Sequence, residues 1–128
     1  MTALLSIKPE FAEAIFNGTK KFEFRKVNFK KNVSKVKVYV TKPVGKIIGE
    51  FLVEEILKDT PKKLWYRTKT YAGIDADRYF EYFNGKDIGF AIKIRRAIKY
   101  KEPICPYLEY QNFIAPQSFK YIKECVYE

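Results

Sequence analysis

A carboxylate stands among cations near the start of the chain, in the segment 18–25. Glu23 lies two residues from both Lys21 and Arg25, and Lys20 precedes the group. Flanking cations hold a carboxylate ionised and oriented, and the planar guanidinium of Arg25 suits bidentate contact with a phosphate. If burial brings the pKa values of Lys20 and Glu23 toward neutrality, the pair can also act as general acid and base. From the pattern alone, a salt-bridge ladder on a solvated strand face remains the simpler interpretation.

Four other residues are candidates for ligand contact. Lys8 directly precedes a predicted helix and would lie near a cleft mouth, or is an ordinary exposed lysine. Trp65 would stack a nucleic-acid base or belong to the core, since aromatic faces accept any base. Gln117 and Ser118 would hydrogen-bond a base edge, or only begin a turn of helix.

Composition excludes several kinds of site. The 128 residues contain no histidine, which excludes Ser-His triads and histidine-bound metals. The two cysteines, Cys105 and Cys125, form no CxxC motif and no disulfide framework. We expect no metal and no cofactor. The N-terminus has no secretory signal and no apolar run has the length of a membrane span, so we expect a cytoplasmic protein with no membrane partner.

Positive charge is concentrated in two blocks. Residues 18–46 hold ten Lys or Arg and one acid, and residues 93–101 hold five and none, in a chain of net charge +10. Such blocks indicate a polyanionic partner, although they are also compatible with strand faces that only keep the protein in solution.

Alternating and helical patterns divide the chain into short elements. In segment 20–26, Phe22 and Phe24 should point toward the core and Lys21, Glu23 and Arg25 the other way. We expect further strands at 4–7, 35–40, 47–56, with a bulge at Gly49, and 88–94.

Helix signals fall between these strands. Pro9 should begin a helix that ends at Asn17-Gly18, and Thr60-Pro61 should begin another. Asp75 is a good N-cap for a third helix, whose buried face would hold Ala76, Tyr79, Phe80 and Phe83. Pro116 should open a last helical turn carrying Phe119 and Ile122.

Together, five or six mixed strands and two or three inserted helices predict one α+β domain over residues 1–128, built as a small β-barrel. Closing the sheet removes exposed strand edges.

Three segments resemble the ASCH (activating signal cointegrator homology) domain. They are Leu5-Ser6-Ile7-Lys8-Pro9, the Gly-x-Lys-x-x-Glu-x-Arg pattern at 18–25, and Ile88-Gly89-Phe90-Ala91-Ile92-Lys93-Ile94. The closing Pro116-Gln117-Ser118-Phe119 is similar to that of some bacterial and phage members. The resemblance implies a PUA-like fold, a pseudo-barrel with a cleft over its sheet that is lined by the Lys and Arg of the motif.

The resemblance also implies a choice of functions. Proteins of the wider group bind RNA or modified bases, some ASCH proteins look like ribonucleases, and a subset hydrolyses acetylated cytidine. Lys20 matches the lysine of those amidohydrolases, but Glu23 stands where they have a catalytic threonine. Since a carboxylate is a weaker nucleophile than an activated hydroxyl, we expect little hydrolysis of acetylated cytidine.

We therefore expect an RNA- or nucleotide-binding module that uses a basic cleft over the sheet. Regulation is one role that such a module could have. Its ligand-contacting residues would be Lys8, Lys20, Lys21, Glu23, Arg25, Trp65, Gln117 and Ser118. The alternatives are a hydrolase of RNA or of a modified nucleoside, with Lys20 and Glu23 as acid and base, and a module that binds an acidic protein. We expect truncation of Lys20 or Arg25 to weaken ligand binding while leaving the melting temperature nearly unchanged.

Overall fold

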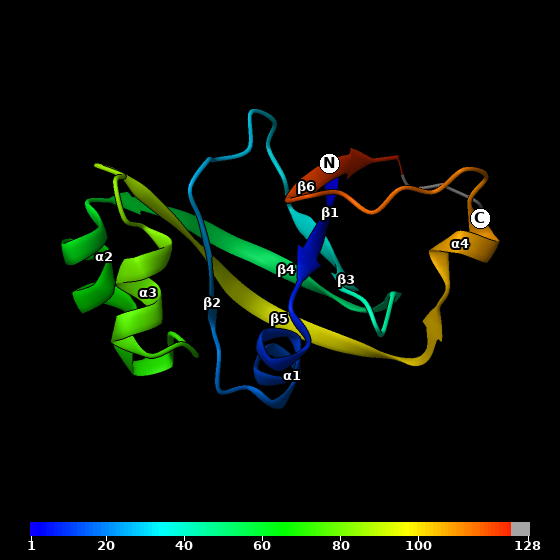
Figure 1. Ribbon diagram of the computed structural model, residues 1–128, viewed down its shortest axis with the longest axis horizontal. Helices are drawn as coiled ribbons and strands as arrows, with labels where there is room; N and C mark the ends of the chain where they lie inside the picture. Colours follow the sequence, from blue (N-terminus) through cyan, green and yellow to red (C-terminus); the bar gives the residue numbers. More distant parts are fainter. Residues whose placement is uncertain (124–128) are drawn as a thin grey trace.

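The computed structural model describes residues 1–123, so that Cys125 lies outside the described part (Figure 1). Its elements, in chain order, are β1 (Thr2–Ile7), α1 (Pro9–Asn17), β2 (Phe22–Arg25), β3 (Lys35–Val40), β4 (Lys46–Asp59), α2 (Pro61–Thr68), the 3-10 helix η1 (Lys69–Tyr71), α3 (Ala76–Tyr82), β5 (Gly89–Ile104), α4 (Pro106–Glu109) and β6 (Phe119–Ile122).

The strands form one mixed, curled sheet in the order β2-β5-β4-β3-β1-β6. β1 runs parallel to β3, and the other neighbours are antiparallel. Figure 1 shows the long strands β4 and β5 crossing the whole molecule, with β2 passing in front of them. The α+β class and the half-barrel of six mixed strands are confirmed. Residues 1–123 contain four α-helices, one more than the two or three expected, because α4 adds a single turn.

Local signals set the ends of the helices. Pro9 occupies the first position of α1, and Gly18 ends this helix with a φ of 88° in the left-handed region. The side chains of Thr60 and Asp75 accept hydrogen bonds from backbone N–H groups in the first turns of α2 and α3. These caps agree with the sequence prediction.

Three hydrophobic clusters hold the elements together. The first packs α1 against the concave face of β1, β3, β4 and β5. The second packs α2 and α3 against Phe22 and Phe24 of β2, both buried as predicted. The third covers the opposite face of the sheet, where residues 100–122 pack over Leu4, Tyr39 and Ile47.

Two expectations about local structure are wrong. Phe119 and Ile122 lie in a strand, β6, which pairs with β1, and not in a helical turn. Phe80 is 40% exposed and Ala76 is exposed, because the seven-residue α3 buries only Tyr79 within its length, and Phe83 just after it.

The predicted bulge at Gly49 is confirmed by a register shift between β4 and its neighbours. No helix within residues 1–123 has the length and apolarity needed to span a bilayer.

Candidate functional site

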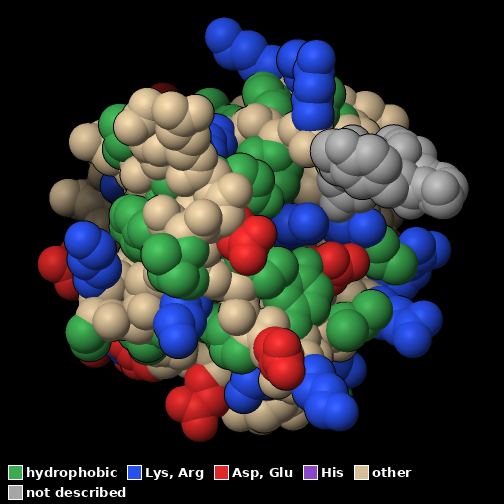
Figure 2. All heavy atoms as spheres, turned by 90° about the vertical axis from the view of Figure 1, so that its right-hand side faces the viewer, with side chains coloured by type: hydrophobic (Ala, Val, Ile, Leu, Met, Phe, Trp, Pro, Cys, Tyr) green, Lys and Arg blue, Asp and Glu red, His purple; other side chains and the backbone are tan. Residues whose placement is uncertain are grey.

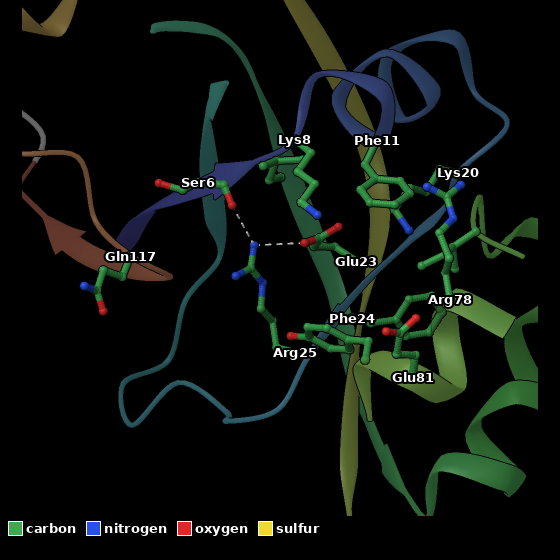
Figure 3. Close-up of a pocket in the computed structure, with 13 residues that line it drawn as sticks. Ser6, Lys8, Phe11, Lys20, Glu23, Phe24, Arg25, Arg78, Glu81 and Gln117 are labelled. Carbon is green, nitrogen blue, oxygen red and sulfur yellow. Dashed lines mark hydrogen bonds and ion pairs between the residues drawn. The ribbon is translucent and has the colours of Figure 1, made fainter. Parts of the chain in front are cut away.

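A cleft of about 480 Å³ opens where the end of β1, the start of α1, strand β2 and helix α3 meet (Figure 3). Strand β2 contributes three consecutive residues to the walls of this cleft, namely Glu23, Phe24 and Arg25. The full lining set is Ser6, Ile7, Lys8, Phe11, Lys20, Glu23, Phe24, Arg25, Ile74, Arg78, Glu81, Tyr82 and Gln117.

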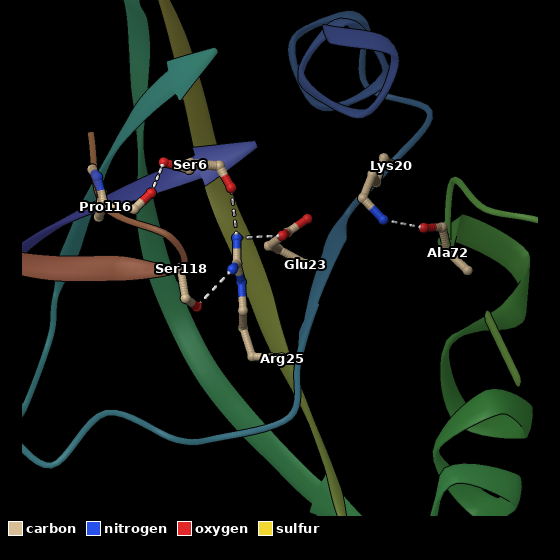
Figure 4. Close-up of polar contacts among 7 residues, drawn as sticks. All are labelled: Ser6, Lys20, Glu23, Arg25, Ala72, Pro116 and Ser118. Atoms are coloured by element: carbon tan, nitrogen blue, oxygen red, sulfur yellow. Dashed lines mark hydrogen bonds and ion pairs between the residues drawn. The ribbon is translucent and has the colours of Figure 1, made fainter. Parts of the chain in front are cut away.

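Arg25 joins the two edges of the curled sheet. Its guanidinium donates to the Glu23 carboxylate at 2.9 Å, to the backbone carbonyl of Ser6 at 3.2 Å and to the Ser118 hydroxyl at 3.0 Å (Figure 4). Ser6 belongs to β1, and Ser118 directly precedes β6. The Arg25 side chain is only 11% exposed, so most of its donors hold the fold together and are not presented to a ligand.

Glu23 is buried under this guanidinium. Because β2 alternates, Glu23 lies on the opposite face from Phe22 and Phe24, as predicted. That face is turned toward the interior of the half-barrel, since Glu23 pairs with the core residue Ile92. The solvated salt-bridge ladder is therefore not what the strand forms: the Glu23–Arg25 pair is internal.

Lys20 is a buried cation at the bottom of the cleft. It is 3% exposed, and its amino group donates to the carbonyl of Ala72 at 2.7 Å. The same amino group lies 5.2 Å from the centre of the Phe11 ring and 4.9 Å from that of Phe24. Burial lowers the pKa of Lys20, while Glu23 opposes that shift and Arg25 adds to it.

Gly73 makes this burial of Lys20 possible. It has a φ of +67°, and a side-chain carbon at this position would collide with the Lys20 side chain. Glycine is the residue that accepts both the left-handed backbone and the close approach.

Some of the charged side chains that line the cleft form ion pairs with other residues of the protein. Four cations and two carboxylates line it. Arg78 is held by Glu10 at 2.9 Å and by Asp75 at 2.8 Å, on the outer side of the Phe11 ring. Lys8 is exposed and has no ion-pair partner within the described chain; Figure 3 shows its amino group pointing toward Glu23. Among the described residues that line the cleft, Lys8 is thus an exposed cation with no ion pair, and Lys20 borders the cavity with an amino group that already donates to Ala72.

Most of the residues expected to contact a ligand meet at this cleft. Five of them line it, namely Lys8, Lys20, Glu23, Arg25 and Gln117, and Ser118 touches it through Arg25. Lys21 and Trp65 lie elsewhere. Lys21 extends over the ring of Tyr71, and Trp65 packs against Tyr79 and Phe80 beside the second hydrophobic cluster.

Sequence reasoning missed the α3 wall of the cleft. Arg78 and Tyr82 stand four residues apart on one side of this helix, with Glu81 next to Tyr82. The i, i+4 spacing of a cation and an aromatic residue was a visible signal. Nothing local indicated that this side of α3 faces the start of α1.

Comparison with known proteins gives a consistent result. The family model of the ASCH domain matches residues 5–115. The ASCH domain-containing ribonuclease of Zymomonas mobilis is 31% identical, and the match covers 95% of this chain and 84% of that protein. The crystal structure of ASCH from Zymomonas mobilis superposes with a TM-score of 0.88 at 31% identity, over 96% of this chain and 88% of that one.

Two longer proteins of Ureaplasma parvum serovar 3 contain a similar stretch. The large ribosomal subunit protein uL22 is 31% identical and the ATP synthase subunit alpha is 32% identical, each over 123 residues. These matches cover 95% of this chain, which spans only 39% and 15% of the respective relatives.

Proposed function

The chain belongs to the ASCH domain family, and we propose that it is an RNA- or nucleotide-binding module whose ligand occupies the cleft above Lys20. One observation carries this proposal: Lys8 and Lys20 both line the cleft, and neither forms an ion pair with a carboxylate among the described residues. A phosphate group supplies the acceptors that such cations require.

The walls of the cleft suit the rest of a nucleotide. Tyr82 offers aromatic surface to a base, and the exposed Gln117 amide offers both a donor and an acceptor to a base edge. RNA is favoured among polyanions because a relative that matches over 84% of its own length carries the name ribonuclease. In this proposal Arg25 and Glu23 keep the cleft in shape, while Lys8, Lys20 and Gln117 contact the ligand.

Fluorescence anisotropy with a labelled single-stranded RNA of 12 nucleotides tests the proposal. We expect binding at low salt that weakens as salt rises, with a log–log slope of about −0.7 for each phosphate contact on a single strand. Lys8→Gln should weaken binding about tenfold, since a charge-assisted hydrogen bond contributes roughly 1.5–3 kcal/mol. Lys101→Gln removes the same charge from the far end of β5 and is the control. No binding at low salt, or equal losses for both variants, would contradict the proposal.

A second candidate function is hydrolysis of RNA. The observation that favours it is the buried Lys20, whose pKa is lowered, beside the carboxylate of Glu23. In this reaction Glu23 accepts the proton of a ribose 2′-hydroxyl while the 2′-oxygen attacks the adjacent phosphorus. The Lys20 ammonium protonates the departing 5′-oxygen, which leaves a 2′,3′-cyclic phosphate and a 5′-hydroxyl.

Gel analysis of an end-labelled RNA incubated with the protein separates binding from hydrolysis. Hydrolysis predicts cyclic-phosphate products that disappear in Lys20→Met. If the RNA is recovered intact under conditions where the protein binds it, hydrolysis is contradicted and the binding module remains as the proposed function. Acetylated cytidine should remain unhydrolysed, because Glu23 replaces the hydroxyl nucleophile.

A further inference from the structure

The outer side of α2 and η1 is a basic, aromatic surface that the cleft does not use. Residues 60–74 contain four Lys or Arg and no Asp or Glu. Helix α2 buries Leu64 and Thr68 and leaves its cations in solvent. We define the α2–η1 surface as the exposed residues Lys21, Lys62, Lys63, Tyr66, Lys69 and Tyr71. None of its four lysines forms an ion pair with another residue in the range 1–123.

The two tyrosines of this surface are exposed in an unusual setting. Tyr66 is 63% exposed and Tyr71 is 45% exposed, and neither ring packs against another aromatic ring of the described chain. Each has a lysine instead: the Lys69 amino group lies 5.1 Å from the Tyr66 ring centre, and that of Lys21 lies 4.2 Å from the Tyr71 ring centre. Aromatic rings interleaved with cations are the means by which proteins bind single-stranded nucleic acid, since bases stack on the rings and phosphates meet the cations.

This surface begins at the wall of the cleft. The N–H of Lys21 donates to the carbonyl of Tyr71 at 2.9 Å, and the amino group of Lys20 donates to the next carbonyl, that of Ala72, at 2.7 Å. The two adjacent lysines therefore go separate ways: Lys20 is buried in the cleft, and Lys21 lies outside on Tyr71. Figure 4 shows the Lys20 side chain reaching toward the carbonyl of Ala72.

We propose that the α2–η1 surface is a path for the single-stranded RNA that continues beyond the nucleotide held in the cleft. The inference rests on the proposed function and adds a second region of contact to it. Tyr71 with Lys21 would meet the nucleotide next to the cleft, and Tyr66 with Lys69 one farther along. Lys62 and Lys63 extend the positive charge along α2.

The chemistry of this surface fits RNA better than a protein partner. Apart from the two tyrosines, residues 60–74 expose no large hydrophobic side chain. The end of the molecule around α4 is different, because Leu108 is 86% exposed and Ile114 is 79% exposed. Figure 2 shows that face, where hydrophobic side chains are mixed with charges of both signs.

The test compares a uridine 12-mer with the single nucleotide uridine monophosphate by anisotropy and competition at low salt. Tyr66→Ala/Lys69→Gln should weaken binding of a 12-mer about fivefold or more, the loss expected when one base stack is removed. Its salt slope should fall by about 0.7 for the lost phosphate contact. Uridine monophosphate, which occupies the cleft alone, should bind to this variant as it does to the parent. Tyr71→Ala, tested separately, should show the same length dependence.

A matched variant controls for the general loss of charge and aromatic surface. Tyr110→Ala/Lys101→Gln removes a tyrosine that is 47% exposed and one cation from the α4 end, and should leave 12-mer affinity within twofold. If Tyr66→Ala/Lys69→Gln also keeps full 12-mer affinity, or if the parent binds the 12-mer no tighter than uridine monophosphate, the path is wrong while the cleft stands. If the parent binds neither ligand, the proposed function fails and the path fails with it.

Discussion

Lys20 is a cation that folding buries almost completely, although it still borders the cleft. Its pKa in the folded chain is lowered, chiefly by burial, whereas the unfolded chain keeps the ordinary value of 10.5. Below the lowered pKa both states hold the proton, and the cost of burying the charge is fully present. Between that pKa and 10.5 the unfolded state holds more protons, so the stability of the fold rises with pH.

This sign leads to a prediction for Lys20→Met, which removes the titration but keeps the length of the side chain. Relative to this variant, the parent should gain free energy of unfolding as pH rises from 7 toward 10, by at most about 1.4 kcal/mol for each unit of pKa shift. Urea unfolding of both proteins at several pH values measures the difference. Parallel profiles would show that Lys20 titrates like an exposed lysine.

Tyr39 makes the opposite contribution in alkaline solution. It is 1% exposed, and its hydroxyl is 2.7 Å from that of Tyr107. Burial, reinforced by this hydrogen bond, raises the pKa of Tyr39 from the ordinary value of 10.0 to about 12. The stability that Tyr39 contributes is thus present below pH 10 and is lost as pH rises from 10 toward 12.

Tyr39→Phe should lower the stability at pH 8 by about 1 kcal/mol, because one hydrogen bond is lost. The same substitution should make the decline between pH 8 and pH 11 smaller than in the parent. Urea unfolding at the two pH values provides the check. An unchanged alkaline decline would mean that other tyrosines, of which Tyr79 also has a raised pKa, account for it.

Among the elements, β2 depends on Arg25 to connect it to the opposite edge of the sheet. From the sequence we expected that truncation of Lys20 or Arg25 would leave the melting temperature nearly unchanged. Because both side chains are buried, we now expect truncation of either to change the stability of the fold. Arg25→Ala leaves the buried Glu23 unpaired and should cost about 3–5 kcal/mol of stability. Arg25→Ala combined with Glu23→Gln should recover part of this loss, since no charge is then left buried.

Hydrogen exchange localises the same effect. The N–H of Ser6 donates to the carbonyl of Ser118 at 3.0 Å, next to the Arg25 contacts. Arg25→Ala should speed exchange of the Ser6 amide more than that of amides in the β3–β4 pair. Uniform acceleration across the sheet would mean that Arg25 stabilises the whole domain without connecting these two edges in particular.

How much of an element could be predicted depended on whether its cause is local. Pro9, Gly18 and Asp75 act on their neighbours in sequence, and the helix ends they predict are correct. Alternation of apolar and charged residues likewise predicted that Phe22 and Glu23 lie on opposite faces of β2. The strand β6 was missed because its pairing partner, β1, lies more than a hundred residues earlier. For the same reason the sequence did not reveal the contact between Arg25 and Ser118, or the α3 wall of the cleft.

At the scale of the whole molecule, the hydrophobic clusters share strands and should not unfold separately. Adjacent residues of β5 belong to different clusters, Ile92 to the one beneath α1 and Ala91 to the one beneath α2 and α3. The prediction of a single domain over residues 1–128 therefore becomes a prediction of one cooperative transition.

Trp65 offers a direct measurement, because it is the one tryptophan of the chain and packs against the second cluster. Its fluorescence reports on α2 and α3, while far-UV circular dichroism reports on all elements. The two unfolding curves should coincide, and the calorimetric enthalpy should equal the van't Hoff enthalpy. Two separate midpoints would show that the α2–α3 region is a second unit of folding.

The order of the strands also bears on synthesis. Arg25 takes its partners from the first strand and from the residue before β6, so β2 emerges from the ribosome long before Ser118 exists to receive it. Chains grow at roughly 5–20 residues per second, which leaves an interval of several seconds in which the cleft lacks its Gln117 side. During that interval the cleft that we propose as the binding site is incomplete. Under the proposed function, the complete cleft is available to a ligand only after translation has passed residue 118.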